Sequence, residues 1–309
     1  MARRAFAATV LVVAAAAAGG CHRPKPAPAA AGHTVRDAMG RDVRLPPHVA
    51  RIVSLAPSAT ETLYALGAGP MIVGLDRYSD YPPAAAAVEK VGTDLEPSLE
   101  RVIALRPDIV FTATSANGRG TVDALEKVGI PVYVSGGERL DGILDDMTRM
   151  GEAIGRKAEG ERLVAGLRAR IAAVRARTSG APRTKALVVV WTEPLIVAGG
   201  GSHVEDLLAA AGAENIAADS AQRYPTYNAE RVVARAPEVV ILGTHSNGAA
   251  AAMPPLFERL HGLPATQQGR IHRVDGDLLD RPGPRLVDGL ELIAPLVHPE
   301  VFSTDGGAR

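Results

Sequence analysis

The sequence predicts an α/β protein with two doubly wound, Rossmann-like lobes joined by one long rigid α-helix. In each half of the chain, short runs rich in Val and Ile alternate with helical segments. This alternation is typical of a parallel sheet covered by helices. A long segment with one apolar stripe at helical spacing separates the two halves.

Residues 156–179 are the segment that predicts the linking helix. Acidic residues come early in this segment and arginines come late, which suits the helix dipole. At about 1.5 Å per residue the helix would be about 30 Å long, enough to reach from one lobe to another. An ordinary packing helix would have the same pattern, so this segment alone leaves both interpretations open. The apolar stripe consists of Leu163, Val164, Leu167, Ile171 and Val174.

Composition limits the classes of protein to consider. With 309 residues the chain is long enough for two domains. Lys and Arg total 34, as do Asp and Glu, so no strong net field favours binding to nucleic acid. The chain has one cysteine, which excludes an intramolecular disulfide. No apolar run long enough to span a membrane follows the N-terminal region.

The N-terminal region is typical of a secreted lipoprotein. Residues 1–20 predict a signal peptide, with Arg3 and Arg4 before an apolar stretch. Small residues immediately before Cys21 resemble a bacterial lipobox, so we expect Cys21 to carry a lipid and to hold the protein at a membrane in the periplasm. Plain secretion without a lipid is the alternative. Residues 21–50 are expected to form a Pro/Ala-rich tether and an N-terminal extension with a hairpin at 35–45.

We expect residues 51–155 to form the N-terminal lobe. Ser58 or Thr60 is expected to cap a helix at 61–66, and residues 77–83 are expected to form a loop because of their prolines and polar side chains. Asp145 and Asp146 are expected on a solvated helix face. Further helices are expected at 99–105 and 121–128, and strands at 52–55, 71–75, 109–111 and 131–134.

We expect residues 180–302 to form a C-terminal lobe of the same build. Strands are expected at 186–191, 239–242 and 271–274, and helices at 204–211, 229–234 and 285–297.

An internal repeat relates the two halves. Residues 99–110 match residues 229–240, and the offset between Glu100 and Glu230 equals that between Pro107 and Pro237. Two similar lobes predict a pseudo-twofold molecule with a ligand cleft between them. Each glutamate either complements the dipole of its helix or meets basic residues of a two-subunit partner.

Four segments of the chain carry a family resemblance: residues 52–61 (Ile-Val-Ser-Leu-Ala-Pro-Ser-Ala-Thr-Glu), 73–83, 99–102 and 212–216. They resemble the periplasmic binding proteins of ABC importers whose lobes are joined by a single helix. These proteins carry cobalamin, haem or ferric siderophores. The loop at 78–83, Tyr-Ser-Asp-Tyr-Pro-Pro, favours the cobalamin-binding members, and the whole resemblance covers about residues 51–296.

The resemblance implies a substrate-binding protein that delivers a corrinoid to an ABC permease. It implies that Glu100 and Glu230 pair with arginines of the two-subunit permease. Judged by matching positions in the sequence, the residues that would contact the ligand are Tyr78, Tyr224, Asp277 and Arg281. Trp191 ends a strand and would face the ligand cleft. The backbone at Pro57 and Ser58 would form the floor of that cleft. Core packing is the alternative for each aromatic residue.

One position departs from the cobalamin-binding pattern. Asp94 stands where those proteins have a tryptophan, so the resemblance leaves the corrinoid open. A haem or ferric-siderophore receptor on the same scaffold is the first alternative. We expect a monomer with no enzymatic activity and no cofactor other than the bound ligand, no nucleic-acid partner, and a membrane contact only through the lipid.

Other chemistries have weaker support in the sequence. Residues 199–202, Gly-Gly-Gly-Ser, lack the lysine of a phosphate-binding loop and predict a tight turn. The histidines are scattered, and His203 with His245 is the one pair that a zinc carrier would use. No Gly-x-Ser-x-Gly turn suggests a hydrolase. A zinc carrier or a metal-dependent enzyme remains the alternative from another class.

Overall fold

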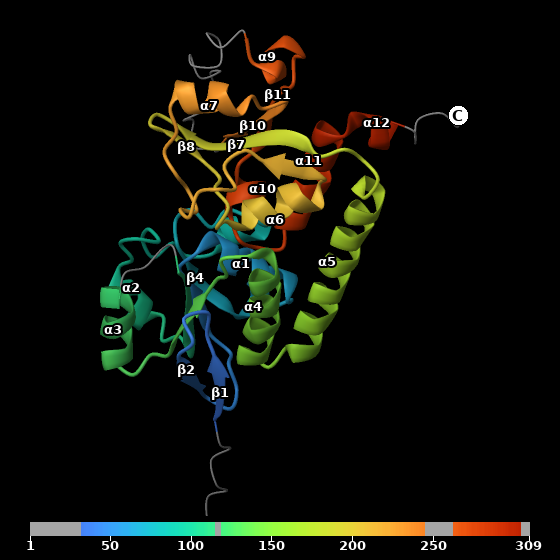
Figure 1. The fold of residues 1–309 in the computed structure, drawn as a ribbon. Helices are drawn as coiled ribbons and strands as arrows, with labels where there is room; N and C mark the ends of the chain where they lie inside the picture. The colour runs from blue at the N-terminus through green and yellow to red at the C-terminus, as the bar shows by residue number, and fades with distance from the viewer. Residues whose placement is uncertain (1–31, 115–118, 245–261, 304–309) are drawn as a thin grey trace, which may run out of the picture. The chain divides into compact units, whose positions relative to one another are not determined.

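The computed structural model describes residues 32–114, 119–244 and 262–303 (Figure 1). The predicted signal peptide, Cys21 and His245 lie outside these residues. The elements alternate between strands and helices and build two mainly parallel sheets, so the predicted α/β class is confirmed. An antiparallel hairpin, β1 (His33–Arg36) with β2 (Asp42–Leu45), precedes them, as predicted.

The first sheet has the strand order β4-β3-β5-β6, and every pairing is parallel. Alternate residues of each strand enter two separate apolar clusters, because successive side chains point to opposite faces. Ile52 and Phe111 belong to one cluster, and Val53 and Val110 belong to the other. The strands are β3 (Ile52–Ser54), β4 (Ile72–Leu75), β5 (Ile109–Ala113) and β6 (Val132–Ser135), and the helices are α1 (Pro57–Ala65), α2 (Leu99–Ala104), α3 (Arg119–Lys127) and α4 (Leu140–Ala153), with short 3-10 turns at Gly69–Met71 and Pro83–Ala87.

The second sheet has the order β11-β10-β7-β8, and β9 also pairs with β7. All pairings are parallel except that of β8, which returns antiparallel beside β7. The strands are β7 (Thr184–Thr192), β8 (Leu195–Val197), β9 (Ala213–Asn215), β10 (Val239–Thr244) and β11 (Ile271–Asp275), and the helices are α6 (His203–Ala210), α7 (Ala229–Arg235), α9 (Pro264–Gln267), α10 (Asp277–Asp280), α11 (Leu286–Val297) and α12 (Pro299–Phe302).

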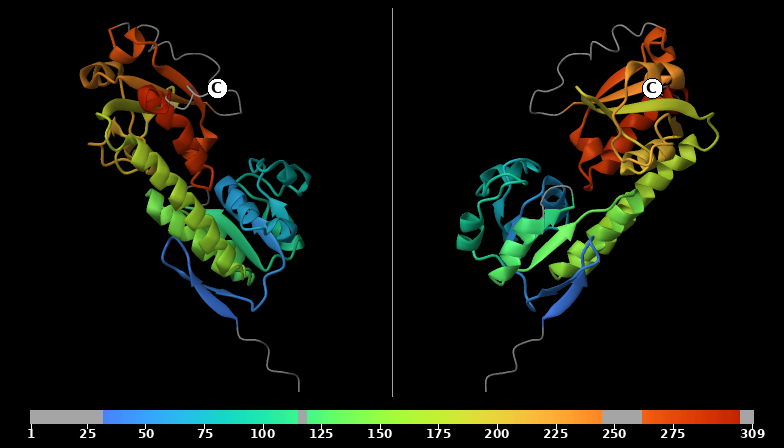
Figure 2. Two further views of the ribbon diagram at one scale, coloured as in Figure 1. Left: turned by 90° about the vertical axis from the view of Figure 1, so that its right-hand side faces the viewer. Right: turned by 60° about the vertical axis from the view of Figure 1, so that its left-hand side comes forward.

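Helix α5 (Lys157–Thr178) lies between the two sheets in the sequence and runs beside α4 (Figure 2). The predicted stripe is confirmed, since Val164, Leu167, Ile171 and Val174 are each less than a tenth exposed. These side chains pack in one apolar cluster with residues of α4, α6 and α11. Leu163 also packs against the cluster of the first sheet. The helix therefore contributes to the cores of both halves.

The two halves repeat each other in backbone geometry. The side chains of Ser98 and Asn228 cap α2 and α7, each accepting a hydrogen bond from the third backbone N–H of its helix. Both helices are followed by a residue in the left-handed region, Arg106 with φ 46° and Ala236 with φ 47°. A residue other than glycine rarely adopts this conformation. The repeat read from the sequence is thus present in the structure.

The predicted start of α1 is wrong. This helix begins at Pro57, four residues before the predicted start, and Ser58 and Thr60 lie inside it. Neither residue caps it, because the N-cap is Ala56, which makes no side-chain hydrogen bond. Pro57 fits the first turn because its fixed φ suits the helix and its missing N–H would have no partner there.

The prediction for Asp145 and Asp146 is half wrong. Asp145 is exposed, but Asp146 is 3% exposed. The Tyr133 hydroxyl donates to Asp146 over 2.7 Å, and the backbone N–H of Gly136 donates to it over 2.9 Å. The carboxylate therefore ties α4 to the end of β6.

Candidate functional site

The predicted ligand residues follow the carboxyl ends of strands. Pro57 and Ser58 come after β3, Tyr78 after β4, and Asp277 and Arg281 after β11. Trp191 is near the end of β7. In open α/β sheets, ligands bind outside the carboxyl ends of the strands, so these loops are where a ligand site is expected.

A cluster of charged groups joins α1 to the segment around α10 and α11. Glu61 on α1 has a side chain that is 2% exposed, and it accepts hydrogen bonds from Arg285 at 2.6 and 2.9 Å and from Arg281 at 3.4 Å. Arg281 also pairs with Asp80 at 2.9 Å and with Asp277 at 2.8 Å. We call these five residues the Glu61 cluster. The Arg281 guanidinium, predicted to meet a ligand, is thus held by three carboxylates.

The loop between α10 and α11 packs closely on the start of α1. A Cβ atom at Gly283 would lie 3.3 Å from Glu61 Oε2 and 3.4 Å from the carbonyl oxygen of Ser58. The guanidinium carbon of Arg285 lies 4.1 Å from the centre of the Tyr81 ring, a cation–π contact. Ser58 and the segment that carries Asp277 and Arg281 are therefore brought together, although they are far apart in the sequence.

A pocket of about 380 Å³ lies beside the Glu61 cluster. Its apolar lining comes from the rings of Tyr64 and Tyr81 and from Leu163 and Leu167. Its charged lining is paired internally, as between Arg170 and Asp288 at 2.6 Å. The sequence analysis did not find this pocket, because its walls come from four separate segments.

The loop that carries Tyr78 is fixed by a buried carboxylate. Asp76 is fully buried and accepts hydrogen bonds from the backbone N–H groups of Tyr78 at 2.8 Å and Ser79 at 3.1 Å. Burial raises the pKa of Asp76, and hydrogen bonds from the Ser79 hydroxyl and from the Tyr78 N–H oppose the rise. The Ser79 hydroxyl lies 2.8 Å from that of Thr60 on α1. Sequence reasoning missed Asp76, although an acid directly after a strand was the available signal.

The three predicted aromatic residues are partly exposed. Tyr78 is 47% exposed, and Trp191 and Tyr224 are each 39% exposed. The indole N–H of Trp191 donates to the Glu193 carbonyl over 2.9 Å. Burial and the negative charge of Asp280 raise the pKa of Tyr224 to about 12. Tyr224 is therefore a neutral phenol at physiological pH. Core packing does not account for rings this exposed.

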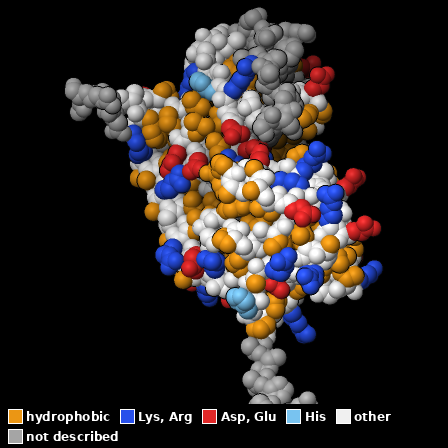
Figure 3. Space-filling view, turned by 180° about the vertical axis from the view of Figure 1, so that it is seen from behind, with side chains coloured by type: hydrophobic (Ala, Val, Ile, Leu, Met, Phe, Trp, Pro, Cys, Tyr) orange, Lys and Arg blue, Asp and Glu red, His pale blue; other side chains and the backbone are white. Residues whose placement is uncertain are grey.

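The predicted docking residues lie in equivalent places. Glu100 is in the first turn of α2 and Glu230 is in the first turn of α7, and both are exposed. On the face shown in Figure 3, acidic and basic side chains are interspersed, as the balanced composition suggests.

Among the described residues, His203 makes a hydrogen bond to the backbone and belongs to no group of side chains that could hold a metal ion. Its Nε2 atom lies 2.7 Å from the Leu279 carbonyl, and its side chain is buried. Within the described ranges, no group of three or more His, Cys, Asp or Glu side chains is arranged to hold a metal ion. In the same ranges, no helix combines the length and apolar character that crossing a membrane requires.

Two α/β halves, a shared long helix and loops grouped at the carboxyl ends of strands define a two-lobed ligand-binding protein. The chain belongs to the periplasmic binding protein family, whose pattern it matches over residues 52–278. It is 28% identical over 242 residues to a vitamin B12-binding protein of Vibrio parahaemolyticus, covering 78% of this chain and 87% of that one. A vitamin B12-binding protein of Yersinia pseudotuberculosis is 31% identical over 197 residues, covering 63% and 70%.

Solved structures agree with this assignment. The periplasmic vitamin B12-binding protein BtuF of Vibrio cholerae matches with a TM-score of 0.70 at 27% identity, covering 81% of this chain and 96% of that one. The periplasmic haem-binding protein RhuT from Roseiflexus sp. RS-1 matches with a TM-score of 0.73 at 28% identity, covering 82% and 99%. The two-lobed fold is therefore shared by proteins named for two different macrocycles.

Proposed function

We propose that this protein is the substrate-binding protein of an ABC importer, which captures cobalamin or a related corrinoid and delivers it to the permease. The observation that carries the proposal is the set of half-exposed aromatic side chains Tyr78, Trp191 and Tyr224 on both lobes, in a chain similar to vitamin B12-binding proteins over most of its length. Flat apolar rings suit the faces of a macrocycle, and neighbouring polar groups suit its amide edge.

Each predicted site residue has a role in this proposal. Tyr78, Trp191 and Tyr224 supply apolar walls, and the backbone at Pro57 and Ser58 supplies a floor. Asp277 and Arg281 act as a polar edge, and ligand entry would exchange part of their ion pairing for hydrogen bonds to the corrinoid side chains.

Haem is the second candidate ligand, favoured by the structural likeness to a haem-binding protein. A tyrosine that ligates haem iron does so as a phenolate. Tyr78 is the candidate for such a ligand, because its ring is the more exposed of the two predicted tyrosines.

The proposal extends to cellular location and chain organisation. Cys21 would carry a lipid that holds a monomeric protein at a membrane in the periplasm. Lobes at 51–155 and 180–302 would be joined by residues 156–179, which contain α5. A single long helix between the lobes would allow only limited closure, unlike a hinge of flexible strands.

Fluorescence titration tests the ligand. Trp191 is the single tryptophan of the chain, so cyanocobalamin should quench the protein's emission and saturate at micromolar concentration or below. Haem, a ferric siderophore and Zn²⁺ are titrated in parallel. Trp191→Phe removes the fluorescence signal, and calorimetry then measures the affinity that this ring contributes. Saturable binding of haem or zinc without cyanocobalamin binding would reject the corrinoid.

A further inference from the structure

Helices α2 and α7 present the same exposed side-chain pattern. Glu100 and Ile103 lie three residues apart on α2, and Glu230 and Val233 lie three residues apart on α7, so each pair shares one helix face. Ile103 is 42% exposed and Val233 is 50% exposed. We call each Glu with its aliphatic partner a Glu–aliphatic pair.

The same backbone geometry holds both pairs. Beneath them, Val102 and Val232 are each fully buried. After them, the Asp108 carboxylate accepts a hydrogen bond from the Arg51 N–H, and the Glu238 carboxylate accepts one from the Lys185 N–H, both over 2.8 Å. The two helices are thus anchored alike at both ends, and each pair has a defined direction relative to its own sheet.

Scattered exposed aliphatic residues are normal on protein surfaces and need no explanation by themselves. Met39 is 51% exposed and Leu292 is 44% exposed, but the residues at the repeat offset are Ala169 and Arg162, so neither is matched by a large exposed hydrophobic side chain. Ile103 and Val233 differ because they occupy the same position of the repeat beside the same acid. Repetition of both features in two lobes favours a partner with two equivalent sites.

The charge of each pair indicates the chemistry of that partner. Neither Glu100 nor Glu230 forms an ion pair with another side chain of the described ranges. Each carboxylate is therefore free to meet a cation, and the aliphatic group next to it can enter an apolar pocket. The fitting partner is a protein that presents, twice, a basic group beside an apolar depression.

We propose that Ile103 and Val233 are the apolar anchors by which this protein docks on the two equivalent subunits of its importer's permease. The inference rests on the proposed function and adds to the predicted role of the glutamates. Desolvated apolar anchors mainly set how long a complex lasts, whereas rim charges mainly set how fast it forms. Within each Glu–aliphatic pair, the aliphatic residue should therefore affect mainly the dissociation rate, and the glutamate mainly the association rate.

Surface plasmon resonance with the source bacterium's corrinoid importer in nanodiscs tests this division. Ile103→Ser and Val233→Ser should each weaken binding about tenfold, mainly through faster dissociation, and together about a hundredfold. Glu100→Gln with Glu230→Gln should instead slow association and reduce its dependence on salt. Met39→Ser with Leu292→Ser is the matched control, one exposed aliphatic from each half, and should leave both rates unchanged.

Cyanocobalamin titration of every variant distinguishes failure of the docking inference from failure of the proposed function. The double variant Ile103→Ser, Val233→Ser could bind cyanocobalamin and dissociate from the importer at the wild-type rate. In that case the anchor role of these two residues is wrong and the proposed function stands. Effects as large in the Met39, Leu292 control would also overturn the proposal. Wild-type protein that binds neither cyanocobalamin nor the importer would reject the proposed function, and the inference with it.

Discussion

His203 is a buried polar residue whose partner comes from a distant part of the chain. It opens α6, and its ring nitrogen lies 2.7 Å from the carbonyl of Leu279 at the end of α10. Because a carbonyl only accepts hydrogen bonds, Nε2 carries the proton. Burial lowers the pKa of His203 below its ordinary value, and the Leu279 hydrogen bond and Asp206 only partly oppose this. The folded protein therefore holds His203 neutral.

This pKa shift predicts a loss of stability in acid. The unfolded chain takes up a proton at His203 near the ordinary value of 6.5, before the folded protein does. The contribution of His203 is complete above that pH and is lost as the pH falls below it, by at most about 1.4 kcal/mol per pH unit. Urea unfolding at several values between about pH 7.5 and 5 measures the slope.

His203→Gln is the control for that prediction. Its amide can still donate to Leu279 but cannot titrate. The free energy of unfolding should therefore fall less steeply with acid in this variant than in the wild type. Equal slopes would show that other groups cause the acid sensitivity.

Burial of single charged residues was the least predictable property at this scale. Asp145 and Asp146 are neighbours with the same side chain, yet only Asp145 is exposed. Helical periodicity places Asp146 toward the sheet, but the bonds that make its burial tolerable come from Tyr133 and Gly136. Such partners depend on tertiary packing, which residue type does not reveal.

At the scale of elements, α4 and α5 cross at two glycines. A Cβ atom at Gly151 of α4 would lie 3.3 Å from Gly160 Cα, and one at Gly160 would lie 3.2 Å from Thr148 Cα. The two backbones therefore approach more closely than larger residues would allow. Gly166 lies further along α5 with no atom within 4 Å of its Cβ position.

The two α5 glycines predict opposite effects of the same substitution. Gly160→Ala should destabilise the protein by about 1–3 kcal/mol, because the added methyl group separates the helices. Gly166→Ala should stabilise it by about 0.5–1 kcal/mol, because alanine has the higher helix propensity and meets open space. Chemical denaturation of both variants is the measurement. A shift of the same sign in both would contradict the assigned crossing.

Elements with strong periodicity were predicted best. The stripe of α5 and the predicted strands of both sheets appear as expected, because regular apolar spacing is itself the signal, whereas the short strands β8 and β9 were not predicted. The start of α1 was missed because Ser58 or Thr60 was predicted to cap the helix, whereas the helix already begins at Pro57, where proline suits a first turn. Helix α10 (Asp277–Asp280) was missed because four residues carry too little periodicity.

At the scale of the whole molecule, the Glu61 cluster joins residues more than two hundred positions apart in the sequence. The side chains of Glu61, Arg281 and Arg285 are 2%, 16% and 14% exposed. In such surroundings, removing one partner leaves an uncompensated charge, which costs more than the pair contributes.

Substitution within the Glu61 cluster tests its contribution to stability. Glu61→Ala should lower the free energy of unfolding by about 3 kcal/mol, since two arginines lose a carboxylate. Glu61→Ala with Arg285→Ala should recover part of that loss, because one orphaned cation is also removed. A double-mutant cycle from urea unfolding gives the coupling. Additive losses in the cycle would mean that the two side chains act independently.

The family and the arrangement of lobes could be predicted because they depend on repeated motifs along the chain. The ligand residues could be named only by position, and Arg281 shows the limit of that method. A basic side chain in the right loop was predicted to meet a ligand, whereas two of its three carboxylate partners, Glu61 and Asp80, come from a part of the chain about two hundred residues away.

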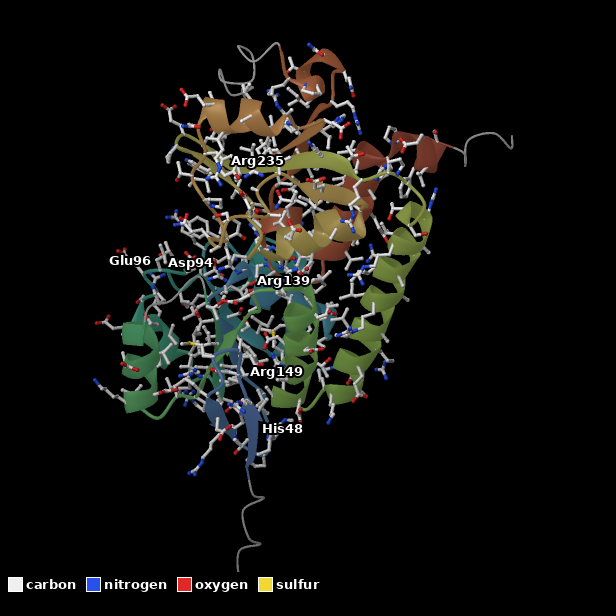
Figure 4. All side chains as sticks on the ribbon, viewed as in Figure 1. His48, Asp94, Glu96, Arg139, Arg149 and Arg235 are labelled. Atoms are coloured by element: carbon white, nitrogen blue, oxygen red, sulfur yellow. The ribbon has the colours of Figure 1, made fainter. Side chains whose placement is uncertain are left out.

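Helix α4 precedes α5 in the chain but shares the apolar interior of the later half. Its Leu140, Ile143 and Met147 pack with residues of α6 and α11, while its Met150 packs with the earlier sheet. At its N-terminal end, Arg139 donates to the Gly200 carbonyl over 2.7 Å and lies beside α6 (Figure 4). A fragment that ends at residue 155 would therefore expose the apolar face of α4 to solvent. A chimaera that exchanges halves between relatives must transfer α4 and α5 together.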